Sequence, residues 1–436
     1  MAGPAIRAWN MALQLHVDND VILLTTDRLG EVTAPFEVKQ ISSGDNARFR
    51  SLERWAEVIV FQGHALSQFS ALRRTKKILV ADIYDPMHLE MLEQGRELDA
   101  ETWDVRIAHA TAVMSEQLIA ADFFLCASER QRSFFLGQLT TLGRVNRRTY
   151  EGDPHLSRLL AVVPFGLEEG APTHVRPTIR GVIPGISADD KLLIWGGGLY
   201  SWFDPLTLIR AMANLAERRP TARLYFLGTR HPKVETMGIV REAHDLAETL
   251  GVLDSVVYFN QEWVEYDDRQ SYLAEADAGV STHLSHVETT FSFRTRILDY
   301  LWADLPMVLT EGDSFAELAA VEGLGIVVPA RDVLALTDAL EAILYDDDVA
   351  ASAVANIRRV KERFFWKKTM APLVDFVARP THAGDYDGRR RVSVRASFRR
   401  SRGLVSSAML VFRGVRQSGI RVTARKVRAR LAHRSL

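Results

Sequence analysis

Short apolar runs that alternate with longer amphipathic stretches recur along most of this 436-residue chain, and they narrow the possible folds more than any other feature. The runs lack strict polar alternation, which is typical of strands buried on both faces of a parallel sheet. The longer stretches fit the helices that connect such strands. The sequence therefore predicts an α/β protein with parallel, doubly wound sheets. The expected strands are residues 21–26, 58–62, 78–83, 123–127, 160–164, 192–195, 224–227, 256–259, 278–281, 307–310 and 325–328.

A polar stretch with several prolines and glycines interrupts this alternation at residues 168–190. Such a composition indicates a linker, and the length of the chain also favours more than one domain. We predict a Rossmann-like domain at 1–167, the linker at 168–190, a second Rossmann-like domain at 191–378 and a tail at 379–436. Ligands of doubly wound sheets bind beyond the carboxyl ends of the strands, so the cleft between the domains is the expected site.

The start of the first domain departs from this scheme. A doubly wound domain normally opens with a central strand, whereas Gly3 and Pro4 lead directly into a helical pattern at residues 5–15. We therefore interpret the first strand as missing. A lost central strand would leave its neighbours with unpaired backbone groups, which favours a true start upstream. The alternative is a variant that has lost part of the domain.

Charge is distributed unevenly along the chain, although the formal net charge is only −1. The last 48 residues carry 15 Lys or Arg and no acid, which leaves 39 basic and 55 acidic residues in the rest. A helix at about 403–434 with an apolar stripe would suit an anionic membrane surface. A solvated tail is the alternative. Nucleic acid is a weaker candidate, because only Phe398 and Phe412 could stack on bases.

The single cysteine, Cys126, allows no internal disulfide and suits a reducing compartment. No apolar run reaches the length of a membrane span, and the first residues do not resemble a secretory signal. We therefore expect a cytoplasmic protein, peripheral at the inner face of the plasma membrane if the tail binds lipid.

Two segments of the second domain suit the binding of an anionic ligand. An expected strand runs into Gly196, Gly197 and Gly198, where a backbone can approach a diphosphate closely. A tight structural turn would explain these glycines equally well. Arg294 and Arg296 lie at the start of a helical pattern, against the helix dipole, which makes sense if an anion binds there. An exposed helix with salt bridges is the alternative.

These segments resemble the donor-binding half of family 4 (GT4) glycosyltransferases of the GT-B fold. The likeness covers roughly residues 1–375 and is closest to bacterial members with a Ser-Phe-Arg-Thr-Arg donor helix, which here is residues 292–296. It is looser in the first half. The stretches that carry it are 196–198, 224–228, 272–281 and 298–306 in the second half, and 3–7, 81–86, 127–131 and 163–166 in the first.

The resemblance implies a retaining hexosyltransferase that moves a sugar from a nucleotide-diphosphate sugar to a cell-surface or lipid-linked glycan, without a metal or other cofactor. Positive side chains and helix-start amides would stabilise the leaving diphosphate. It assigns Asp299 to the nucleotide ribose and Glu288 to the donor sugar. The remaining donor-binding candidates are Gly3, Gly197, Gly198, Arg230, Arg294 and Arg296.

The chain also departs from the family pattern. Two glutamates eight positions apart are usual, but Asp299 stands at the second position and Phe291 at the first. Glu288 therefore fits only if the loop differs. The family's Lys after the glycine turn is absent from residues 199–205, so arginines would have to supply the charge.

The histidines leave several interpretations open. His88 is the preferred catalytic histidine because Asp82 and Asp85 lie beside it in sequence, and His64 is the alternative. His283 and His286 could line the donor site, pack structurally or, with Glu288, bind zinc.

Two other functions stay open at this point. One is a nucleotide-sugar epimerase of the same fold. The other is a non-catalytic scaffold, which the missing strand and the missing first glutamate would fit.

Overall fold

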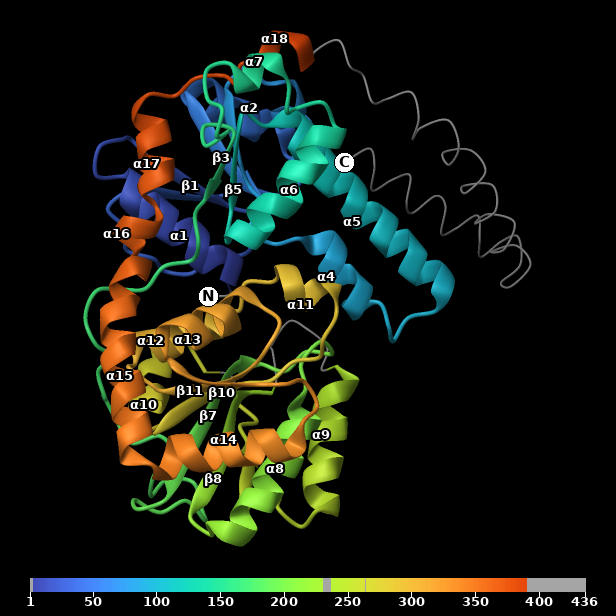
Figure 1. Ribbon diagram of the computed structural model, residues 1–436. Coiled ribbons are helices and arrows are strands. Elements are labelled where there is room, and N and C mark those ends of the chain that lie inside the picture. The colour runs from blue at the N-terminus through green and yellow to red at the C-terminus, as the bar shows by residue number, and fades with distance from the viewer. Residues whose placement is uncertain (1–2, 230–236, 263, 390–436) are drawn as a thin grey trace, which may run out of the picture. The chain divides into compact units, whose positions relative to one another are not determined.

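The computed structural model describes residues 3–229, 237–262 and 264–389. It confirms an α/β architecture with parallel sheets in two halves (Figure 1). Residues up to Ala383 form one compact unit, separate from the residues that follow. The described part of the tail is residues 379–389, which end in the short helix α18 (Tyr386–Arg389); the expected helix at 403–434 lies outside the described residues.

The strands are β1 (Ile22–Thr25), β2 (Glu37–Gln40), β3 (Val58–Gln62), β4 (Ile78–Asp82), β5 (Phe123–Cys126), β6 (Leu160–Val162), β7 (Lys191–Gly198), β8 (Ala222–Gly228), β9 (Val257–Phe259), β10 (Ala278–Ser281), β11 (Met307–Thr310) and β12 (Gly325–Val328). The helices of the first half are α1 (Gly3–Leu15), α2 (Asn46–Trp55), α3 (Ala65–Gln68), η1 (Leu72–Arg74), α4 (Met87–Gln94), α5 (Ala100–Ala120), α6 (Glu129–Thr141) and α7 (Arg147–Tyr150). Those that follow are α8 (Pro205–Arg218), α9 (Gly238–Thr249), α10 (Arg269–Ala274), α11 (Val287–Phe291), α12 (Thr295–Trp302), α13 (Ser314–Glu322), α14 (Val333–Tyr345), α15 (Asp347–Lys361), η2 (Glu362–Phe364), α16 (Trp366–Thr369) and α17 (Ala371–Ala378).

The second half contains a six-stranded parallel sheet in the order β12-β11-β10-β7-β8-β9. The chain starts in the middle at β7, moves outward to β9 and then returns to β10 on the other side of β7. This is the strand order of a Rossmann sheet, and the reversal lies between β7 and β10. Ligands of such sheets bind outside the carboxyl ends of the strands at that reversal. The fold therefore directs attention to Gly197, Gly198 and the residues that follow Ser281.

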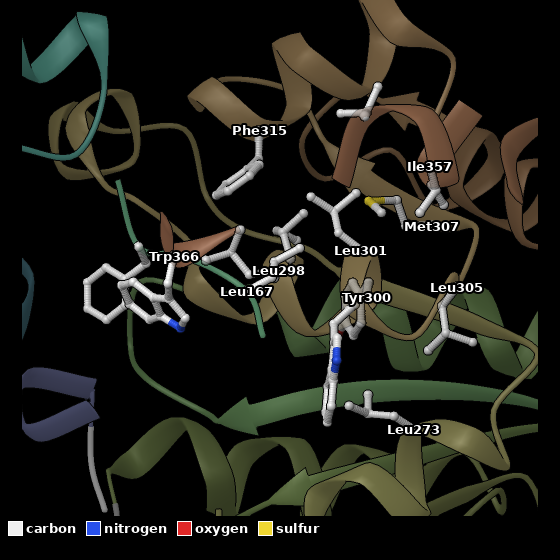
Figure 2. Packing of buried hydrophobic residues seen from close by; sticks show 14 of the residues in the cluster. Leu167, Leu273, Leu298, Tyr300, Leu301, Leu305, Met307, Phe315, Ile357 and Trp366 are labelled. Atoms are coloured by element: carbon white, nitrogen blue, oxygen red, sulfur yellow. The ribbon is translucent and has the colours of Figure 1, made fainter. Parts of the chain in front are cut away.

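The side chains of β7 alternate between two hydrophobic layers. Leu193 and Trp195 pack with α8 and α14, whereas Leu192 and Ile194 pack with α12 and the end of α15. Both sets are fully buried, which explains why the run Leu192–Trp195 is apolar without polar alternation. Figure 2 shows part of the second layer, where Tyr300, Leu301, Met307 and Ile357 lie together.

Tyr300 holds α12 against the centre of this sheet. Its hydroxyl accepts a hydrogen bond from the Gly196 amide at 2.9 Å and donates to the Val280 carbonyl at 2.8 Å. The ring lies directly over Gly279, where an added Cβ would approach the ring carbons to 2.5–2.7 Å. Gly279 is therefore required by a close approach of the ring to the backbone of β10.

Replacing Gly279 with Ala should lower stability by about 1–3 kcal/mol, the usual effect of overpacking a core. The Tyr300 ring is buried and its hydroxyl is hydrogen-bonded to both β7 and β10, so it has little room to move away. The midpoint of thermal unfolding measures the loss. Gly137→Ala is the matched control: this position lies exposed in α6 with open space beside it, and alanine there should raise stability slightly. Equal midpoints for the two variants would contradict the assignment.

The first half differs from a continuous doubly wound sheet. Strands β3, β4, β5 and β6 form a parallel sheet in chain order, while β1 and β2 form a separate parallel pair. Within the described residues the chain enters α1 at Gly3 with no strand before it. Strand β2 was not predicted, because its sequence Glu-Val-Lys-Gln is polar and its side chains are partly exposed.

Two of the expected segments also make contacts that the sequence did not predict. The polar stretch at 168–190 is packed, because the Glu275 carboxylate accepts hydrogen bonds from the amides of Thr178, Ile179 and Arg180 at 2.6–2.8 Å. Residues 366–378 pack on the first half: α16 and α17 contact α1, and Phe376 stacks on Phe123 of β5. The last helices of the predicted second domain therefore pack against the first sheet.

Candidate active site

A glycine turn forms the first part of the site at the carboxyl end of β7. Gly197 has a φ of +79°, and the space beside its Cα is open. Gly228, at the end of β8, approaches the backbone of Gly197 so closely that a Cβ would meet it at 2.9 Å. The expected glycines therefore lie together at the ends of neighbouring strands, with a backbone that a ligand can approach. Gly3 lies elsewhere, as the first residue of α1.

Arg296 is the charged group next to this turn. Its Nη2 donates to the Gly198 carbonyl at 2.8 Å, and its guanidinium lies over the rings of Trp195 and Phe203 at 4.4 and 4.0 Å. The residue is only 8% exposed, and burial lowers the pKa of Arg296 to about 10. No carboxylate among the described residues forms an ion pair with it, and Nη1 has no hydrogen-bond partner there.

Burying the Arg296 guanidinium in this way raises the free energy of the folded protein unless an anion binds beside it. A buried charge needs a partner, and a buried donor without an acceptor costs about 1–3 kcal/mol. The two aromatic faces stabilise the cation in part. The remaining donor is available for an anionic ligand beside the Gly198 turn.

Arg294 is placed differently. Its guanidinium forms a bidentate ion pair with Glu288, at 3.1 Å to Oε1 and 2.7 Å to Oε2. Both side chains are buried, and Asp313 lies 3.9 Å from the Arg294 Nε. The helical backbone is interrupted at Ser292, between α11 and α12, and this interruption allows two residues six positions apart to meet. The charge of Arg294 is thus neutralised within the protein, and the two residues expected to bind the donor lie side by side.

Asp299 lies on α12, beyond Arg296. One of its oxygens accepts from the Arg269 Nε at 3.0 Å, and the side chain remains 30% exposed. Arg269 in turn lies over the rings of Tyr266 and Trp302. The second carboxylate oxygen of Asp299 is thus left for a ligand hydroxyl. Arg230, the remaining expected donor ligand, lies outside the described residues.

His283 and His286 lie close to the buried ion pair. The His283 Nε2 is 3.1 Å from the Glu311 carbonyl, and burial lowers the pKa of His283 to about 3. His286 is the N-cap of α11, with Glu288 at 3.7 Å and Glu93 of α4 at 3.9 Å. Across the described ranges no group of three or more His, Cys, Asp or Glu could hold a metal ion.

His88 lies on α4 but faces α6. Its ring stacks on Phe134 at 5.5 Å, and its Nε2 is 3.3 Å from the Gln138 side chain. Burial lowers the pKa of His88 to about 4, so the ring is neutral near pH 7. The structure therefore does not bring His88 together with Asp85 in the way that the sequence interpretation assumed. Its assignment as the catalytic histidine stays a prediction.

The first half contains a cavity of about 610 Å³ at the carboxyl ends of β3 and β4. Its wall includes the start of α1, with Pro4, and the helices α4 and α5. His64 lines it and stacks on His109 at 5.6 Å; His88 does not line it. The alternative histidine is thus the one that faces the cavity.

Two carboxyls of this cavity share a hydrogen bond. Asp85 follows β4, and Glu90 lies one turn into α4. Burial, together with the negative charge of Glu288, raises the pKa of Asp85 to about 6, and burial raises the pKa of Glu90 well above its usual range. The pair thus holds a proton under conditions where isolated carboxyls are ionised. Sequence reasoning noted Asp85 and missed Glu90, although the acidic residues on α4 were visible.

Asp85→Asn should stabilise the protein more at pH 7.5 than at pH 4.5. A carboxyl whose folded pKa is raised destabilises the fold as pH rises from its ordinary value of 3.8 to the folded value of about 6. Asparagine removes that penalty and can still hydrogen-bond Glu90. We expect a gain of about 1–2 kcal/mol at the higher pH, read from thermal midpoints. Asp104→Asn, on the exposed face of α5, should show no such difference; an identical gain at both pH values for Asp85→Asn would refute the raised pKa.

Several contacts join the two halves around these groups. The Gln131 side chain at the start of α6 donates to the Tyr84 and Phe291 carbonyls, each at 2.8 Å. Arg130 forms an ion pair with Glu317 of α13. The ends of β4 and α11 are thus held near each other, which places the cavity of the first half close to the buried Glu288–Arg294 pair. No helix of the described residues is both long and apolar enough to cross a membrane.

These features are those of the GT-B fold, with a parallel sheet in each half and a strand-order reversal at the centre of the second. Residues 190–346 match the sequence profile of the family "Glycosyl transferases group 1". The match spans β7 to α14 and includes the glycine turn, both arginines and Asp299.

Comparison with known proteins extends this likeness to both halves. The D-inositol 3-phosphate glycosyltransferase of Xylanimonas cellulosilytica is 26% identical over 322 residues, which cover 68% of this chain and 72% of that protein. The sucrose-phosphate synthase of Thermosynechococcus elongatus has a similar structure, with a TM-score of 0.62 and 14% identity over 87% of this chain and 93% of the other. HepE of Anabaena, solved with UDP-glucose, gives a TM-score of 0.60 and 13% identity over 87% of this chain and 96% of the other.

Proposed function

We propose that this protein is a retaining glycosyltransferase of the GT4 type that transfers a hexose from a nucleotide-diphosphate sugar to a glycan acceptor. The observation that carries the proposal is Arg296, a buried cation with a free donor beside the Gly197–Gly198 turn. A diphosphate supplies the anion that this site lacks. The relatives support it, since HepE is described with UDP-glucose and the group 1 profile covers the same residues.

In this proposal the two phosphates lie between the glycine turn and Arg296. The nucleotide ribose would contact the free oxygen of Asp299, whose other oxygen is held by Arg269. As the bond between the sugar and the phosphate breaks, negative charge develops on the diphosphate. A positive group already fixed in a water-poor site stabilises that charge without reorganising. The protein thus needs no metal ion for this role, and none is assigned.

Glu288 has a positioning role in this scheme. Its carboxylate is held by two hydrogen bonds from Arg294, so it is an acceptor of fixed orientation for a hydroxyl of the donor sugar. Because both partners are buried, each fixes the position of the other.

Titration calorimetry with UDP, GDP and dTDP, each with and without EDTA, tests the proposal. We expect one nucleotide to bind in the micromolar range and EDTA to leave its affinity unchanged. The sugar nucleotide of that base would then be incubated with acceptors, and the anomeric configuration of the product would be read by NMR. Inversion at the anomeric carbon would refute the retaining assignment. An absence of heat with all three nucleotides would refute the transferase and favour the non-catalytic scaffold.

A glycan that is part of the cell surface or linked to lipid is the proposed acceptor, and the basic tail at 379–436 motivates that choice. Fifteen Lys or Arg without an acid after residue 388 would attract anionic lipid. Flotation of the full chain with vesicles of 30% phosphatidylserine, against pure phosphatidylcholine, tests this. Equal recovery with both vesicles would refute a membrane role for the tail.

A further inference from the structure

The cavity of the first half is apolar over most of its wall. Its lining from α4 and α5 includes several aliphatic and thioether side chains, and it continues to the end of β4. At about 610 Å³ it is large enough for a sugar with an attached hydrocarbon group. The apolar residues of this wall are Ile83, Met87, Met91, Val105, Ala110 and Met114.

The polar part of the wall includes three acids, Asp82, Asp85 and Glu90, beside amide, tyrosine, histidine and arginine side chains. The charge of Asp82 is balanced, because Arg7 grips its carboxylate with two bonds of 2.7 and 2.8 Å. Asp85 and Glu90 share a hydrogen bond and form no ion pair with a cation in the described part of the chain, although the charge of Arg294 acts on Glu90.

The cations of the wall do not offset these acids. Arg106 and His109 lie on the exposed face of α5. His64 is stacked on His109, and burial lowers the pKa of His64, which favours its neutral form. Among the described lining residues there is thus no buried cation that a phosphate could bind, in contrast to Arg296 in the second half.

We infer that this cavity accepts an uncharged, hydroxyl-bearing acceptor with an apolar part, and that it discriminates against acceptors that carry a phosphate. The hydroxyls would hydrogen-bond to the carboxyls of Asp85 and Glu90, which can donate as well as accept while they share a proton. The apolar part would contact Met87, Met91 and Met114, whose flexible side chains adapt to irregular shapes. A phosphate there would face two carboxyls that no ion pair within the described residues neutralises.

This acceptor class differs from the one in the name of a relative. The D-inositol 3-phosphate glycosyltransferase of Xylanimonas is named for a phosphate-bearing substrate. At 26% identity the acceptor of one protein need not be that of the other, because specificity depends on a few groups in the pocket. The acceptor class also rests on the transferase function proposed above, since a cavity alone does not define a reaction.

The test compares hexyl β-D-glucopyranoside with its 6-phosphate, a pair that differs only in the charged group. Binding to the full-length protein is measured by saturation-transfer NMR titration, which requires neither donor nor turnover. We expect the uncharged probe to bind at least 10-fold more tightly. Glu90→Gln should reduce that preference several-fold by removing one acid, whereas Asp104→Asn, which removes an exposed charge on α5 away from the lining, should leave it unchanged.

Each outcome decides between the alternatives. Equal or tighter binding of the phosphate, or no binding of either probe, overturns the acceptor class. An unchanged preference in Glu90→Gln overturns the role of the acidic pair. The nucleotide titration described above is run on the same protein. If the protein binds nucleotide but prefers the phosphorylated probe, only this inference is refuted. If it prefers the uncharged glucoside but binds no nucleotide, the transferase function is refuted and the selectivity of the cavity stands.

Discussion

Arg296→Met should weaken binding of the donor nucleotide about 100-fold, equivalent to about 3 kcal/mol, while the unliganded protein becomes as stable as before or more stable. Methionine keeps an apolar chain over the rings of Trp195 and Phe203 but removes the charge that faces the glycine turn. Since Arg296 is a buried cation without an ion-pair partner in the described part of the chain, its removal relieves a desolvation penalty. Lower affinity together with unchanged or higher stability distinguishes a binding residue from a structural one.

The measurement combines nucleotide calorimetry with the thermal midpoint of the unliganded variant. Arg218→Met is the control, because Arg218 is a surface residue whose ion-pair partners are Asp338 and Glu341 and not the glycine turn. It should change neither quantity by much, since exposed pairs contribute about 0–1 kcal/mol. If Arg296→Met binds nucleotide as tightly as the parent, or if it loses affinity only because it unfolds, Arg296 does not bind the diphosphate.

The second sheet could be predicted closely from the sequence because its central strands β7, β10 and β11 are almost completely buried on both faces. The run Leu192–Trp195 is apolar at every position since its side chains serve two hydrophobic layers. Strand β2 could not be found in this way, because Glu37 and Lys39 make it polar and it pairs only with β1. The strand was missed because it has a single neighbouring strand and partly exposed side chains, and so contains no buried apolar run.

The individual roles in the site were less predictable than its location. The resemblance selected Arg294 and Arg296 together, and the sequence treats them alike. Their difference depends on tertiary contacts: Glu288 reaches Arg294 across the break at Ser292, whereas Arg296 turns toward Gly198 and two rings. Likewise, His88 lies close to Asp85 in sequence, but the turn of α4 directs its ring to Phe134 of α6.

The Glu288–Arg294 pair gives the second large expected effect. Arg294→Met alone should destabilise the protein by about 3–5 kcal/mol, because it leaves a buried carboxylate without its cation. The double variant Glu288→Gln/Arg294→Met should regain most of that stability, since it leaves no uncompensated charge from the pair. Thermal midpoints of the parent, both single variants and the double variant form a complete cycle, and a coupling near zero would show that the two residues do not stabilise each other.

The same cycle separates the two arginines in function. If the diphosphate is bound by Arg296, the double variant should bind nucleotide within a few-fold of the parent, because the charge of Arg294 is already neutralised in the protein. It should nevertheless transfer sugar poorly, since Glu288 no longer presents a fixed carboxylate to the donor sugar. A double variant that is folded but has lost nucleotide binding about 100-fold would instead place Arg294 at the phosphates. That result would require the ion pair between Arg294 and Glu288 to open when the donor enters. Glu288 would then need another hydrogen-bond donor. Arg294 would still have an acid nearby, because Asp313 lies 3.9 Å from its Nε.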